Sequence, residues 1–117
     1  MNDRELLELA AKACGQEYWI TRLGPRTAIT EQLHYKGCDG ETKIWNPLTD
    51  DGEAFRLVVM LELLVHVETC YYAHAIKDGM TATEHIGNDG KGCIFAATRR
   101  AIVQAAAEIG KRMEAGL

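Results

Sequence analysis

The sequence lacks any pair of cysteines with the close spacing of a local zinc site or a thioredoxin-type redox motif. Its four cysteines, Cys14, Cys38, Cys70 and Cys93, are far apart along the chain. The first residues also lack the apolar stretch of a secretory signal peptide, because acidic residues interrupt them. We therefore expect a cytoplasmic protein with reduced thiols rather than a secreted domain held together by disulfides.

Basic residues are scarce relative to acidic ones. The 117 residues include 13 lysines and arginines against 17 aspartates and glutamates, which gives a formal net charge of -4. Non-specific binding to nucleic acid requires a surplus of basic side chains on one face. The composition therefore argues against such binding, and it leaves open a small anionic ligand held by a local basic cluster.

The chain also lacks an apolar run long enough to span a membrane. The longest run, residues 54–67, is interrupted only by Arg56, Glu62 and His66, and it is shorter than the roughly 20 residues that a bilayer requires. An aspartate and a glutamate at its start form a capping-box pattern. We therefore predict a helix that is buried on most of its circumference, with Glu62 and His66 on its one solvent-exposed stripe.

The N-terminal segment has the signals of a capped helix followed by a strand. Asn2 and Glu5 form a capping box, and Gly15 supplies the left-handed stop that commonly ends a helix. Residues 17–23, "EYWITRL", are rich in aromatic and β-branched side chains. This composition predicts a strand.

Two Asp-Gly pairs predict two hairpins. The segment "TAITEQLHYKGCDGETKIW" is expected to turn on Asp39-Gly40, because this dipeptide tolerates the positive φ angles of a type I′ turn. The segment "ETCYYAHAIKDGMTATEHIG" is expected to turn on Asp78-Gly79. A two-residue loop there pairs Lys77 with Met80, and the remaining pairs follow: His74 with Thr83 and Tyr72 with His85.

A long helix is predicted for "CIFAATRRAIVQAAAEIGKRMEAG" at the end of the chain, with one apolar stripe. The stripe comprises Phe95, Ile102, Ala106, Ile109 and Met113. The element order is then α-β-β-β-α-β-β-α, one α+β domain over residues 1–117. We expect an antiparallel sheet of hairpins packed on the buried central helix, together with the N- and C-terminal helices.

The second hairpin carries the residues best suited to metal binding or catalysis. Tyr72, His74 and His85 share one face with Cys70, and two diagonal histidines could bind a transition metal. A catalytic zinc site normally needs three protein ligands, which this spacing does not provide. We therefore expect no cofactor and no stoichiometric zinc, and we interpret the face as a solvated or partner-facing surface.

A second group of residues could hold a small anion such as a nucleotide. The glycine-rich segment "GNDGKG" carries Lys91 just before the terminal helix, whose N-terminus attracts anions. Tyr35 and Trp45 could form an aromatic wall, and Arg99 and Arg100 could bind a phosphate or a carboxylate. The alternative is that Trp45 packs against the helix that follows it and that the arginines are solvated.

Two sequence blocks resemble a known group of proteins. "WNPLTDDGEAFRLVVML" at residues 45–61 and "AATRRAIVQAAAEIGKRM" at residues 96–113 are similar to blocks in short accessory proteins of tailed phages and prophages of Gram-negative bacteria. The group has no agreed activity that could be carried over to individual residues. Both blocks coincide with predicted helices, and the second hairpin and the glycine-rich loop lie outside them.

The resemblance implies a protein that works in the cytoplasm of an infected or lysogenic bacterium. Phages use many such proteins to disable host defence, so the leading hypothesis is a non-catalytic protein that binds a host or phage protein. One alternative is a sponge that sequesters a small anionic nucleotide. Another is a small metal-dependent enzyme on the histidine face, although the sequence shows no catalytic triad or zinc protease motif.

The apolar run also suggests a homodimer. We expect the terminal helices to cover most of residues 54–67, and a second copy of the chain to bury the apolar surface that remains. Leu61 is expected to lie in the core on this interpretation.

Overall fold

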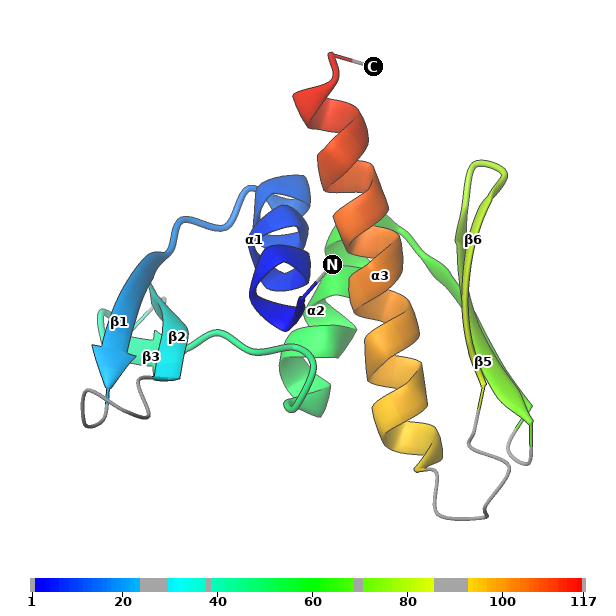
Figure 1. The fold of residues 1–117 in the computed structure, drawn as a ribbon, viewed down its shortest axis with the longest axis horizontal. Helices are drawn as coiled ribbons and strands as arrows, with labels where there is room; N and C mark the ends of the chain where they lie inside the picture. The colour runs from blue at the N-terminus through cyan, green and yellow to red at the C-terminus, as the bar shows by residue number, and fades with distance from the viewer. Residues whose placement is uncertain (1, 24–29, 38, 69–70, 86–92, 117) are drawn as a thin grey trace.

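The computed structural model describes residues 2–23, 30–37, 39–68, 71–85 and 93–116, and within them it contains three helices and two three-stranded antiparallel sheets (Figure 1). The elements in chain order are α1 (Asp3–Cys14), β1 (Trp19–Leu23), β2 (Thr30–Lys36), β3 (Thr42–Ile44), α2 (Asp51–Leu61), β4 (Leu64–Glu68), β5 (Tyr72–Lys77), β6 (Met80–His85) and α3 (Ile94–Glu114). The predicted α+β class is confirmed, with one more strand than the sequence suggested.

The helices lie between the two sheets (Figure 1). Strand β2 contacts α1, whereas β5 and β6 contact α3. A single cluster of buried residues draws on all three helices and on both sheets. None of the described helices is long and apolar enough to cross a membrane.

Helix α1 begins and ends where the sequence predicts. The Asn2 side chain accepts a hydrogen bond from the Glu5 backbone N–H, and the Glu5 carboxylate accepts one from the Asn2 N–H. Gly15 ends the helix at φ 72°, in the left-handed region that glycine adopts without strain. These reciprocal contacts satisfy backbone groups that the helix itself leaves unpaired.

Of the two type I′ turns predicted from the Asp-Gly pairs, the structure contains one. The second is confirmed: Lys77 pairs with Met80, and both Asp78 (φ 48°) and Gly79 (φ 80°) have the positive φ angles of a type I′ turn. In the first hairpin Lys36 pairs with Thr42, so the loop is longer than two residues, and only the glycine of Asp39-Gly40 has a positive φ. The predicted type I′ turn on Asp39-Gly40 is therefore wrong.

The long helix predicted over residues 54–67 is also wrong in its second half. Helix α2 ends at Leu61 because Glu62 adopts a left-handed conformation (φ 54°, ψ 47°), after which the Leu63 N–H bonds the Val58 carbonyl. The chain continues as β4, which pairs with β5. The alternation of Leu64-Val65-His66-Val67-Glu68, with two β-branched residues, suits a strand.

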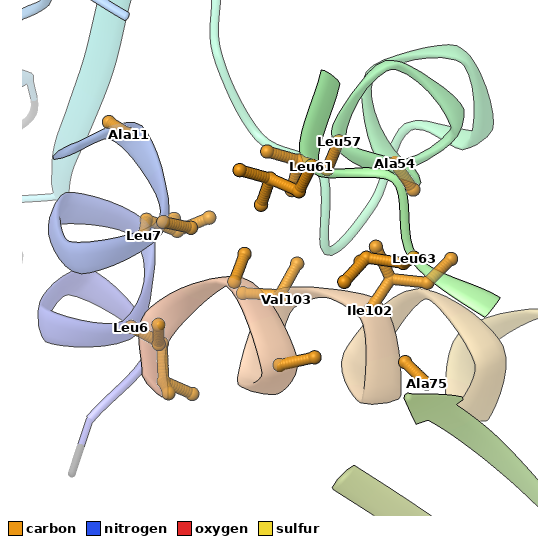
Figure 2. Packing of buried hydrophobic residues seen from close by; sticks show 14 of the residues in the cluster. Leu6, Leu7, Ala11, Ala54, Leu57, Leu61, Leu63, Ala75, Ile102 and Val103 are labelled. Atoms are coloured by element: carbon orange, nitrogen blue, oxygen red, sulfur yellow. The ribbon is translucent and has the colours of Figure 1, made fainter. Parts of the chain in front are cut away.

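The central helix of the fold is α3 rather than α2. It contacts α1, α2, β5 and β6, and the buried residues Ala73 and Ala75 of the second sheet face it. Figure 2 shows Leu7 of α1 and Leu61 of α2 directed toward Val103 of α3. The predicted stripe on α3 is correct in its middle, but its two ends, Phe95 and Met113, are exposed.

Candidate binding surfaces

The outer face of the second sheet, on the side away from α3, gathers one tyrosine and three histidine rings. The pairing places His66 opposite His74, and Tyr72 between Glu68 and His85. Alternation along each strand puts these side chains on the face opposite Ala73 and Ala75. We call this surface the ring face. It comprises Leu64, His66, Glu68, Tyr72, His74, Ile76, Thr81, Thr83 and His85.

The four rings of the ring face form one contiguous cluster. The ring centroids of Tyr72 and His74 are 4.3 Å apart, and His66 stacks on His74 at 6.3 Å with an interplanar angle of 20°. His85 meets Tyr72 edge-on at 6.2 Å. The cluster is ordered by polar contacts, since His74 Nδ1 is hydrogen-bonded to Thr83 Oγ1 at 2.7 Å.

The sequence identified three of these rings but missed the fourth. The sequence predicts a helix at His66, whereas the structure places this residue in β4, directly across from His74. Its Nε2 lies 3.2 Å from Glu68 Oε1. Among the described residues, no three histidine, cysteine, aspartate or glutamate side chains are placed to hold one metal ion together. Cys70, which was expected on this face, lies outside the described residues.

The aromatic residues suggested for a nucleotide site are core residues. Trp45 is 3% exposed and Tyr35 is 4% exposed. The Tyr35 hydroxyl donates a hydrogen bond to the Glu53 carboxylate of α2. Burial and this contact with the carboxylate raise the pKa of Tyr35 to about 12, because both favour the neutral phenol. Both rings are therefore buried in the core, and neither is accessible to stack on a ligand. The packing of Trp45 against the helix that follows it stays a prediction.

Arg99 and Arg100, which were suggested to bind a phosphate or a carboxylate, both form hydrogen bonds within the chain. Arg99 Nε donates to the Leu48 carbonyl at 2.8 Å, and its Nη1 donates to Asp51 Oδ1 at 2.6 Å. Arg100 Nη1 donates to Asp3 Oδ1 at 3.1 Å. Lys91 and the rest of the glycine-rich segment lie outside the described residues.

An apolar groove of about 460 Å³ lies between α2, the first half of α3 and β4. Its apolar lining consists of Ala54, Phe55, Val58, Val65, Val67, Ile94, Phe95 and Ile102. Phe55 and Phe95 are each 66% exposed, although both are large apolar residues. The ion pair between Arg99 and Asp51 lies at the same groove. The sequence did not reveal this groove, because α2 was expected to be buried on nearly all sides.

Strand β4 separates the two surfaces. Val65 and Val67 line the apolar groove, whereas the alternate residues His66 and Glu68 belong to the ring face. The single strand that the sequence did not predict therefore contributes to both candidate sites.

No family model, no curated protein and no solved structure matches the chain. The resemblance to phage accessory proteins therefore stays a prediction.

Proposed function

We propose that this chain is a non-catalytic accessory protein that acts by binding a partner protein through the ring face. The observation that supports the proposal is the cluster of Tyr72 with three histidines on a sheet face that lies away from the described helices. Of the ring-face residues, only Glu68 is an acid, and none is a lysine or arginine. Interface cores are typically depleted in charged residues and enriched in aromatic ones, tyrosine above all.

A protein partner agrees with the geometry better than an anionic nucleotide does. A nucleotide site needs accessible cations and accessible ring faces, whereas Arg99 is paired with Asp51 and both Tyr35 and Trp45 are buried. The ring face contains no lysine or arginine, so it offers a phosphate no permanent positive charge. A broad sheet surface with amphipathic rings favours another folded surface instead.

The biological setting of the proposal comes from the resemblance of residues 45–61 and 96–113 to phage and prophage proteins. On this basis the chain acts in the cytoplasm of an infected or lysogenic bacterium, and its partner is a host or phage protein. A component of a host defence system is the partner that such an accessory protein would most usefully block.

Photo-cross-linking in phage-infected cells, followed by binding measurements, tests this proposal. A photo-reactive phenylalanine analogue at position 83, within the ring face, should give a discrete adduct, whereas the same analogue at position 111, an exposed position near the end of α3, should not. The adduct is then identified and the partner is purified. Tyr72→Ala should weaken binding by roughly 30-fold, because truncating a central tyrosine often costs about 2 kcal/mol.

Tyr71→Ala is the matched control, since Tyr71 is adjacent, 68% exposed and outside β5. Equal loss of affinity in both variants, or no loss in Tyr72→Ala, would contradict the ring face as the binding surface. A rise in the thermal midpoint with one member of a nucleotide panel would instead favour the sponge hypothesis.

A further inference from the structure

The outward side of α2 is unusually apolar for a surface helix. Val59 and Met60 are each 59% exposed, and Phe55 is 66% exposed. The opposite side of the same helix buries Ala54, Leu57 and Leu61. A helix that is apolar on both sides is normally covered on both sides.

This exposed side is continuous with the apolar groove, because Phe55 belongs to both. Two-thirds of a phenylalanine side chain amounts to about 100–150 Å². Phe55, Val59, Met60, Val67 and Phe95 together therefore expose several hundred Å² of apolar surface, which is large for one patch on a monomer. A standard interface buries about 800 Å² on each partner, so this patch supplies the apolar core of such an interface.

The charges that flank the patch are self-complementary. Arg56 and Glu62 lie at equal distances along the sequence on either side of Val59. If two copies of α2 pack antiparallel about a two-fold axis near Val59, each Arg56 faces Glu62 of the other copy. The Glu62 side chain is 87% exposed, and its Oε2 lies 4.0 Å from Lys77 Nζ. Arg56 makes no ion pair or hydrogen bond with another described residue.

We propose that a second copy of this chain covers the outward side of α2 and the adjoining apolar groove, in a two-fold symmetric dimer. The antiparallel arrangement opposes the two helix dipoles, and it places unlike charges together in a chain whose net charge of -4 would otherwise cause repulsion. The same interface leaves the ring face on each copy open, because Val65 and Val67 face the groove while the alternate residues of β4 face away.

Sedimentation equilibrium of the whole chain tests the dimer. The wild-type protein should sediment at twice its 13.0 kDa chain mass at micromolar concentration. Val59→Glu should raise the dimer dissociation constant by at least about 100-fold, because two carboxylates would meet at the axis. Ile44→Glu is the matched control, since Ile44 is an exposed apolar residue of β3, and this variant should remain dimeric. Circular dichroism checks that both variants are folded.

A charge-reversal cycle tests the two-fold arrangement itself. Arg56→Glu and Glu62→Arg should each weaken the dimer by roughly 10-fold, and the double variant should recover affinity to within about 3-fold of wild type. A wild-type monomer at high micromolar concentration would overturn the proposal, as would an undiminished Val59→Glu dimer. A double variant that is weaker than both single variants would overturn the Arg56–Glu62 pairing.

Discussion

Helices α2 and α3 both bury apolar side chains in the core, yet they occupy very different places in the fold. Helix α3 buries small residues, and Ala101, Ala105 and Ala106 are completely inaccessible. Helix α2 carries larger side chains and leaves Phe55 and Met60 largely in water. Small side chains let neighbouring backbones approach closely on several sides at once, whereas large ones hold neighbours away. Side-chain size, more than hydrophobicity, decides which helix lies at the centre.

The two helices are also attached to the fold in different ways. Helix α3 is packed so closely against α1 that a methyl group at Gly110 would collide with the Leu9 carbonyl oxygen. Helix α2 is fastened by polar contacts at its ends, where Arg99 bonds Asp51 and Lys77 Nζ donates to the Leu61 carbonyl at 2.7 Å. The first attachment depends on close steric fit, whereas the second combines the burial of Leu57 and Leu61 with individual hydrogen bonds. Each should therefore respond to different substitutions.

The largest effect should distinguish the two sides of α2. Leu61→Asp places an uncompensated charge at a side chain that is only 8% exposed, and it should leave the protein unfolded. Met60→Asp, one residue earlier at 59% exposure, should fold with a similar circular dichroism spectrum. A soluble, folded Leu61→Asp protein would show that this side of α2 is not part of the core.

A smaller effect should come from the contact between α1 and α3. Gly110→Ala would normally favour a helix, but here the added methyl group must push the Leu9 backbone away. Overpacking of this kind costs about 1–3 kcal/mol, so denaturant unfolding should show a loss of about that size. Lys111→Ala, at the next and exposed position, should change stability by less than about 0.5 kcal/mol. Equal stability of Gly110→Ala and wild type would argue against the close approach.

Arg99 tests the polar attachment of α2. Removing its hydrogen bonds to Leu48 and Asp51 in Arg99→Ala should cost about 1–2 kcal/mol in the free energy of unfolding. Arg99→Lys should restore only part of this, because an ammonium group cannot reproduce the planar donor geometry of a guanidinium. Full recovery in the lysine variant would mean that the positive charge of Arg99, and not its donor geometry, accounts for its contribution.

Features that depend on neighbouring residues were predictable from the sequence. The capping box of α1 and the hairpin on Asp78-Gly79 each involve residues within one turn, so their signals lie in a few adjacent letters. The end of α2 was not predictable in this way, because its signal is a glutamate in a left-handed conformation that non-glycine residues seldom adopt. Because the helix was predicted to continue past Glu62, His66 was not predicted to lie on the ring face.

The candidate site was predictable only where it follows from strand register. Tyr72, His74 and His85 were placed on one face because alternation along a hairpin fixes the direction of side chains. Whether Arg99 and Trp45 are accessible to a ligand depends on contacts between distant segments of the chain. The pattern of a single sequence does not reveal such contacts. The apolar groove was missed for the same reason, since it forms only when α2, α3 and β4 come together.

The smallest expected effect concerns the hydrogen bond from Tyr35 of β2 to Glu53 of α2. Because the pKa of Tyr35 is raised from its ordinary value of 10.0 to about 12, the folded chain retains the phenolic proton more tightly than the unfolded chain does. The resulting stabilisation is fully present below pH 10 and is lost as the pH rises through about 12.

Tyr35→Phe should cost about 1 kcal/mol at neutral pH, because Glu53 loses its donor. Its stability should then fall less steeply than that of wild type between about pH 10 and about pH 12, since the variant has no phenol to ionise there. Urea unfolding of both proteins across this range measures the difference, and parallel pH profiles would show that the Tyr35 phenol contributes nothing to the attachment of α2.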